Sequence, residues 1–112
     1  MKVIIGGRGL GKTRTLAKMA QEDPTLVLVT PTSSRAKRIQ DEYPDLKGRI
    51  LSAYQVDLGV LRGTKVKGLL VDDVLECLGY LGRMGHQHGI QAISIDCEEA
   101  EVINLNTKAK GE

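Results

Sequence analysis

The sequence contains no tryptophan and no phenylalanine, and its 112 residues include only three tyrosines. The apolar interior must therefore be built from Val, Ile and Leu, which pack well in buried strands. With so few aromatic rings, the chain also lacks a series of stacking platforms on which successive bases of a single strand could lie. This scarcity argues against base readout, while it leaves binding to a nucleic-acid backbone open.

Long apolar runs, paired cysteines and a large net charge are also missing. The apolar runs are far shorter than the roughly 20 residues needed to cross a bilayer. Cys77 and Cys97 stand singly, without C-x-x-C spacing and without a secretory segment before them, so reduced thiols in a cytoplasm are expected, the host cytoplasm if the protein is viral. The net charge of +2 is too small to indicate nucleic-acid binding by itself.

The most informative segment that is present reads GGRGLGKT at residues 6–13. Its spacing matches the phosphate-binding loop pattern G-x-x-x-x-G-K-[ST] in full. Glycines let backbone N–H groups converge on phosphate oxygens without obstruction by a Cβ atom. We expect Lys12 to point into solvent-filled space and reach the outer phosphates, and the Thr13 hydroxyl to ligate the Mg²⁺ that the phosphates carry. The expected nucleotide-binding residues are Gly6, Gly7, Arg8, Gly9, Leu10, Gly11, Lys12, Thr13 and Arg14.

The segments on either side of this loop, together with those that follow, predict an α/β fold of the P-loop NTPase class. The expected strands alternate with helices along the chain, and within each strand successive residues are apolar instead of every second one. This pattern favours a mostly parallel sheet of five or six strands with helices on both faces. We expect one domain over 1–106 and a polar tail over 107–112. Strands are expected over 2–6, 25–30, 49–56, 68–73, 90–96 and 101–106.

Helices are expected over 13–21, from about 33 to the exit at Pro44, and over 74–84. Ser33 or Ser34 is expected to cap the second of these helices. In the third, Val74, Leu78 and Leu81 are expected to face the core, although Gly79 and Gly82 within it and Gly85 directly after it weaken it.

A second motif, LLVD followed by Asp73, has the form of a Walker B segment. A buried strand of this kind delivers a carboxylate beside the phosphates, so Asp72 is expected to hold the water shell of Mg²⁺. Asp73 is then placed to orient or deprotonate the attacking water. Asp73 can also simply cap the following helix, and the two roles can coexist.

With both motifs placed, the chain resembles the minimal RecA-like core of the additional-strand P-loop ATPases, which include helicases, AAA proteins and viral DNA-packaging motors. GGRGLGKTRTL is similar to the loop of phage terminase large subunits, and VTPT at 29–32 is similar to the segment after the second strand of helicase-type ATPases. The resemblance covers roughly residues 2–96. It implies that Lys12, Asp73 and Arg8 are catalytic, with Arg8 stabilising charge on the γ-phosphate, unless Arg8 is only a solvated side chain at the loop rim.

The same resemblance implies that the fifth strand lies between the two motif strands. Ser94 and Asp96 end this strand, and Ser94 would act as a polar sensor of the γ-phosphate, unless it merely faces a helix.

The sequence also departs from that pattern. The acid after the Walker B aspartate is usually Glu in those families, whereas here it is Asp73, which is one methylene shorter. Because small misplacements of a catalytic group are costly, we expect tight ATP binding and slow hydrolysis. We expect no counterpart of the upstream adenine-binding segment, the terminase nuclease domain or the second RecA-like domain of helicases.

Partners are suggested by local clusters of positive charge. Such clusters are usually solvated faces, but the turn after the second strand should emerge at the carboxyl edge of the sheet, where α/β proteins bind ligands. We therefore expect Arg35, Lys37 and Arg38 to contact a DNA or RNA backbone. A protein partner, or a second copy that supplies an arginine in trans, is also expected.

Three functions follow, all with ATP and Mg²⁺ as cofactors. The first is a slow Mg-dependent ATPase acting on or with nucleic acid, as in viral DNA packaging or replication. The second is a hydrolysis-poor nucleotide-binding module that regulates a protein partner. The third is a small-molecule phosphotransferase, which needs an arginine-bearing lid, and the loop over 57–67 is the one arginine-containing loop of any length. NTKA at 106–109 does not match the N-K-x-D pattern of GTPases.

Overall fold

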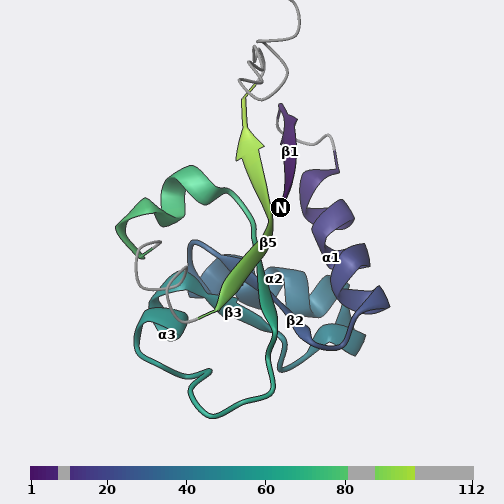
Figure 1. Cartoon of the computed structure of the whole chain (residues 1–112). Coiled ribbons are helices and arrows are strands. Elements are labelled where there is room, and N and C mark those ends of the chain that lie inside the picture. Colours follow the sequence, from purple (N-terminus) through teal and green to yellow (C-terminus); the bar gives the residue numbers. More distant parts are fainter. Residues whose placement is uncertain (8–10, 81–87, 98–112) are drawn as a thin grey trace, which may run out of the picture.

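The computed structural model of the chain describes residues 1–7, 11–80 and 88–97, and it has an α/β fold built on one five-stranded sheet (Figure 1). All strand pairs are parallel, and the strand order is β1-β5-β4-β2-β3. The predicted parallel sheet is therefore confirmed, whereas the sixth strand over 101–106 and the tail over 107–112 lie outside the described residues. The strands are β1 Lys2–Gly6, β2 Leu26–Thr30, β3 Ile50–Ser52, β4 Gly68–Val71 and β5 Gly89–Asp96.

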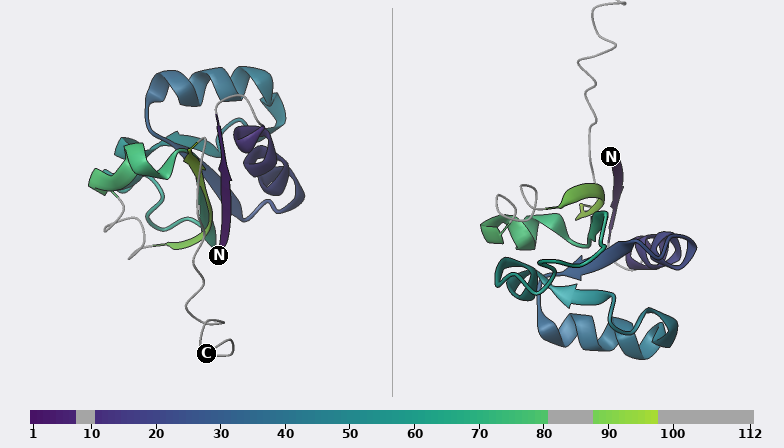
Figure 2. Two further views of the ribbon diagram at one scale, coloured as in Figure 1. Left: turned by 90° about the horizontal axis from the view of Figure 1, so that it is seen from above. Right: turned by 60° about the horizontal axis from the view of Figure 1, so that its bottom comes forward.

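Helices cover both faces of this sheet, as predicted (Figure 2). One face carries α1 Lys12–Glu22, α2 Ser33–Glu42 and the 3₁₀ helix η1 Pro44–Leu46. The other face carries α3 Ala53–Asp57 and the 3₁₀ helix η2 Val74–Tyr80. Among the described residues, no helix is long and apolar enough to span a membrane.

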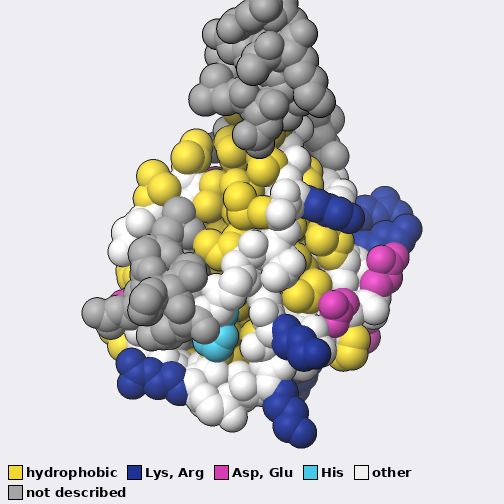
Figure 3. Space-filling view, viewed as in Figure 1, with side chains coloured by type: hydrophobic (Ala, Val, Ile, Leu, Met, Phe, Trp, Pro, Cys, Tyr) yellow, Lys and Arg dark blue, Asp and Glu magenta, His cyan; other side chains and the backbone are white. Residues whose placement is uncertain are grey.

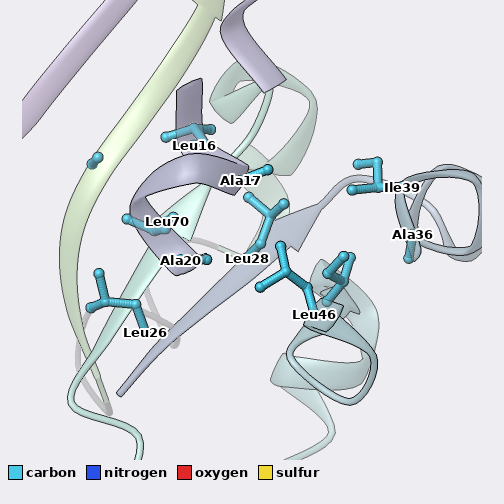
Figure 4. Close-up of a cluster of buried hydrophobic side chains, with 11 residues drawn as sticks. Leu16, Ala17, Ala20, Leu26, Leu28, Ala36, Ile39, Leu46 and Leu70 are labelled. Atoms are coloured by element: carbon cyan, nitrogen blue, oxygen red, sulfur yellow. The ribbon is translucent and has the colours of Figure 1, made fainter. Parts of the chain in front are cut away.

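The central strands supply side chains to two separate cores. Leu28 of β2 and Leu70 of β4 pack with Leu16 and Ala20 beneath α1, as Figure 4 shows. The neighbouring residues Val27, Val29, Leu69 and Val71 point to the other face and pack with α3 and η2. Because successive side chains of a strand point to opposite faces, a strand covered on both sides has to be apolar throughout.

The cap of α2 differs from the prediction. Thr32, rather than Ser33 or Ser34, is the N-cap residue, since its backbone is extended and its side-chain oxygen accepts a hydrogen bond from the Arg35 N–H at 3.2 Å. The helix therefore begins one residue earlier than a cap at Ser33 would allow.

The strand expected over 49–56 is also wrong in its second half. β3 ends at Ser52, and α3 begins directly after it, because Ser52 and Gln55 form a capping box. The Gln55 N–H donates to the Ser52 hydroxyl at 3.2 Å, and the Ser52 N–H donates to the Gln55 side chain at 2.9 Å. The pattern S-x-x-Q in the sequence was the signal for this helix start.

The segment after β4 is a 3₁₀ helix over Val74–Tyr80 instead of an α-helix that continues through these residues. With three residues per turn, positions 74, 77 and 80 share one face. Val74 and Cys77 are accordingly buried and Tyr80 packs beside them, whereas Leu78, expected in the core, is exposed. Leu81, also expected in the core, lies outside the described residues.

Within the described part of the chain, the β1 end of the sheet is only partly covered. Ile4 packs against the core beneath α1, but Val3 and Ile5 point to the opposite face and are exposed. Figure 3 shows hydrophobic side chains gathered on this side of the molecule.

Candidate functional site

Several of the predicted site residues that the structure describes meet at the carboxyl edge of the sheet. β5 lies between β1 and β4, as the resemblance implies, with Gly6 paired to Asp96 and Val71 paired to Ile93. Gly6 and Gly7, at the end of β1, therefore lie beside the end of β5, and β5 in turn lies beside β4, so these strand ends bring the predicted acidic and polar residues to one edge. Edges of this kind are where open α/β sheets bind their ligands.

The glycine-rich segment leads directly into α1. Gly7 is buried, and Gly11, the N-cap residue of α1, has a φ of 80°, a left-handed conformation that favours glycine. Arg8, Gly9 and Leu10 lie outside the described residues, so the catalytic role expected for Arg8 stays a prediction.

Lys12 is folded back into the site. Its ammonium group donates a hydrogen bond to the Gly7 carbonyl oxygen and lies 3.7 Å from a carboxylate oxygen of Asp96, and only 11% of its side chain is exposed. Lys12 also lines the cavity described below, so the expectation that it points into solvent-filled space holds in part, but its ammonium group is held by a carbonyl and a carboxylate instead of extending freely. Asp96 is thus the carboxylate partner of Lys12, a role that the sequence analysis missed.

Asp72 is held between two hydroxyl groups. Thr13 Oγ1 donates to one carboxylate oxygen at 3.0 Å, and Ser94 Oγ donates to the other at 2.7 Å. Asp72 is buried, and Ser94 is completely buried. These contacts fix the rotation of the carboxylate and place the Thr13 hydroxyl beside it.

Ser94 also supports the turn that follows β4. Its hydroxyl oxygen accepts a hydrogen bond from the Asp73 N–H at 2.7 Å, and Asp73 has a φ of 53°, which is uncommon for a residue other than glycine. In the described conformation Ser94 therefore positions Asp72 and the Asp73 backbone, while its role as a phosphate sensor stays a prediction.

Asp73 is paired with Arg35 of α2. Arg35 Nη1 donates to Asp73 Oδ2 at 2.9 Å and lies 3.3 Å from Glu76 Oε2. The hydrogen bond to Asp73 raises the pKa of the Arg35 guanidinium, although burial opposes this effect. An N-cap residue has extended backbone, whereas Asp73 has a positive φ and its carboxylate binds Arg35, so the geometry differs from that of a helix cap.

These residues line one cavity of about 400 Å³ between the strand ends and α2. This volume lies within the usual range for a small-molecule site. Arg35 and Arg38, predicted to contact nucleic acid, both line this cavity, whereas the third predicted residue, Lys37, is exposed and is not one of the lining residues. The lining residues are Lys12, Thr13, Arg35, Arg38, Ile39, Glu42, Asp72, Asp73, Ser94 and Asp96.

A second cavity of about 260 Å³ adjoins the first through Lys12, Thr13 and Glu42. Arg14, predicted to bind nucleotide, lines this second cavity together with Gly11 and Tyr43. Glu42, at the C-terminal end of α2, could not be predicted as a cavity residue from the sequence, because its position depends on how α2 packs against α1.

The oxygen atoms of the site suit Mg²⁺ only in company with a ligand. Within residues 1–7, 11–80 and 88–97, no group of three or more His, Cys, Asp or Glu side chains could hold a metal ion by itself. Thr13 and Asp72 do supply a hydroxyl and a carboxylate side by side, and Mg²⁺ is commonly held by one or two such groups together with substrate phosphates.

Comparison of the chain with protein-family models, curated proteins and solved structures found no match. The functional interpretation therefore depends on the two motifs and on the geometry of the cavity. The likeness to terminase and helicase cores stays an inference from the residues quoted above.

Proposed function

We propose that the chain binds MgATP in the larger cavity and is a slow Mg-dependent ATPase that acts with nucleic acid. The observation that carries the proposal is the meeting of Lys12, Thr13 and Asp72 on one cavity at the carboxyl edge of a parallel sheet. A lysine, a hydroxyl and a carboxylate in this arrangement are the side chains that P-loop proteins use for phosphates and their magnesium ion.

The charges around the cavity support a requirement for Mg²⁺. Four carboxylates line it, those of Glu42, Asp72, Asp73 and Asp96, against the three cations Lys12, Arg35 and Arg38. A triphosphate alone would add negative charge to this set, and bound Mg²⁺ would offset it. Lys12 would exchange Asp96 and the Gly7 carbonyl for phosphate oxygens, while Thr13 and Asp72 would stay in place as ligands.

Two features support slow turnover. Asp73 is one methylene shorter than the glutamate usual in the resembled families, and in the described conformation Arg35 holds its carboxylate at 2.9 Å, so this ion pair has to open before Asp73 can act. Water attacking the γ-phosphorus needs a free acceptor within hydrogen-bond distance. The same ion pair favours the second candidate, a nucleotide-binding module that regulates a protein partner.

The third candidate, a small-molecule phosphotransferase, gains support from α2. A phosphotransferase of this kind needs arginines near its phosphates, and Arg35 and Arg38 of α2 line the cavity. The sequence had instead suggested the loop over 57–67 as the source of these arginines. An acceptor with a phosphate group would suit that wall of the cavity.

Replacement of Lys12 by alanine tests the nucleotide site. Because a hydrogen bond to a charged partner contributes about 1.5–3 kcal/mol, Lys12→Ala should weaken MgATP binding by about 10–100-fold in calorimetry. The matched control is Lys18→Ala on the exposed side of α1, which removes the same charge and should leave affinity unchanged. Equal MgATP affinities of Lys12→Ala and the parent protein, with both folded by circular dichroism, would refute the site.

Turnover measurements separate the three candidates. ATP hydrolysis should be slow for the protein alone and should increase when single- or double-stranded DNA is added, if the first candidate is correct. Tight MgATP binding without hydrolysis under all these conditions would favour the regulatory module. Transfer of phosphate to an added small-molecule acceptor would favour the phosphotransferase.

A further inference from the structure

Arg35 occupies an unusual position for a residue near the start of a surface helix. Its guanidinium reaches from α2 across the cavity wall to the turn after β4, where it contacts both Asp73 and Glu76. Only 16% of the Asp73 side chain is exposed, so this carboxylate is mostly shielded from water and depends on Arg35 for neutralisation.

Both described contacts use the same atom of Arg35, the terminal nitrogen Nη1. A guanidinium carries five N–H donors in a rigid plane, and Nη1 supplies two of them. Arg35 also lines the cavity that Lys12 and Thr13 line. The guanidinium therefore contacts a carboxylate and also borders the cavity in which the outer phosphates of a nucleotide would lie, and Asp73 lines that cavity too.

We propose that Arg35 is a γ-phosphate-sensing residue that exchanges the Asp73 carboxylate for the terminal phosphoryl group of a bound nucleoside triphosphate. This inference rests on the function proposed above. A diphosphate places no group at that position and leaves the Arg35–Asp73 pair intact. Binding of a triphosphate draws the guanidinium into the cavity and frees the Asp73 carboxylate, so that the acidic group becomes available only when the γ-phosphate is present.

The charge of the competing groups makes this exchange favourable. A terminal phosphoryl group carries more than one negative charge and presents three acceptor oxygens, whereas Asp73 offers a single charge. Arg38 follows Arg35 by one helical turn and lines the same cavity, so a phosphoryl group close to Arg35 would face two guanidinium groups.

Paired binding measurements test the exchange. The probes are ADP and a non-hydrolysable ATP analogue, each with Mg²⁺, titrated by calorimetry into the parent and its variants. Arg35→Gln should weaken analogue binding about tenfold and change ADP binding less than about twofold, since the lost contact is a charge-assisted hydrogen bond to the terminal phosphate. Lys47→Gln, an exposed change of the same charge, is the control and should alter neither affinity.

A second variant moves affinity in the opposite direction. Asp73→Asn removes the competing carboxylate charge but keeps Arg35, so analogue affinity should rise several-fold in the presence of Arg35 and by much less in the Arg35→Gln background. A merely structural role of Arg35 would not produce this dependence.

The outcomes separate the two proposals. If the parent binds neither probe, the nucleotide site itself is refuted. If the parent binds both, and Arg35→Gln weakens both to the same extent or neither, nucleotide binding stands and the sensing role of Arg35 is overturned.

Discussion

The fully buried Ser94 hydroxyl gives the most direct test of the site geometry, because it can be removed without a change of charge. It donates to Asp72 at 2.7 Å and accepts from the Asp73 N–H at 2.7 Å, so Ser94→Ala breaks two hydrogen bonds at once. One of these bonds has a charged partner, and the other satisfies a backbone N–H in a turn of positive φ.

The expected cost follows from these two losses. A hydrogen bond to a charged group contributes about 1.5–3 kcal/mol, and an N–H left without a partner adds about 1 kcal/mol where water can partly replace the hydroxyl, so we expect a loss of about 2.5–4 kcal/mol. With an unfolding entropy of about 2.1 cal/mol/K for each residue of the 112-residue chain, this corresponds to a fall in Tm of about 11–17 °C.

Urea unfolding followed by circular dichroism measures this loss. Ser34→Ala is the matched control, since Ser34 is exposed on α2 and its replacement should change stability by less than about 0.5 kcal/mol. If Ser94→Ala also costs less than about 0.5 kcal/mol, the Ser94 hydroxyl does not hold Asp72 and the turn in solution, and the reasoning is refuted. Ser94→Ala should also weaken MgATP binding, because the Asp72 carboxylate loses the hydrogen bond from Ser94 and can then rotate.

Two further predictions concern buried groups. Within the described part of the chain, the Thr30 hydroxyl is completely buried without a hydrogen-bond partner, so Thr30→Val should keep stability or raise it by up to about 1 kcal/mol in urea unfolding, and a loss above 1 kcal/mol would reveal a missed partner. Burial, and then the nearby Asp73 and Asp72 carboxylates, raise the pKa of the Cys77 thiol to about 12 from an ordinary value near 9. In a Cys97→Ser background, Cys77 should therefore resist maleimide at pH 8 until the protein is unfolded, and rapid labelling of the native protein would contradict this. Because the native protein keeps this thiol neutral, the corresponding contribution to stability is complete below pH 9 and is lost as the pH rises towards 12. Urea unfolding at a series of alkaline pH values should therefore give a falling free energy of unfolding.

Local chemistry determined much of this protein from its sequence alone. Continuous apolar runs such as LVLVT and GLLV predicted buried parallel strands because only strands covered on both faces need apolar residues at successive positions. The loop pattern with Gly11, Lys12 and Thr13 likewise predicted where α1 begins, since the conformation of Gly11 and the start of the helix are local properties.

The errors arose where two local signals competed. The β-prone residues over 49–56 favoured a strand, but the Ser52–Gln55 capping box ended β3 and started a helix. In η2, the choice between three and 3.6 residues per turn decided whether Leu78 or Cys77 is buried, and the sequence alone fits either period.

Tertiary structure alone decided two of the side-chain pairs in the site. The partners Lys12 and Asp96, and Arg35 and Asp73, are far apart in the chain, and they meet because β5 inserts between β1 and β4 while α2 packs beside α1. The contact between Thr13 and Asp72, by contrast, agrees with the shared magnesium role that the two motifs predicted. A sequence pattern shows which residues are close along the chain. Side chains that are distant in sequence pair only as the order of the strands and the packing of the helices allow, and both depend on the whole chain. The sequence therefore determined which chemical groups the site contains, and the fold determined that Arg35 lies against Asp73 and that Lys12 lies against Asp96.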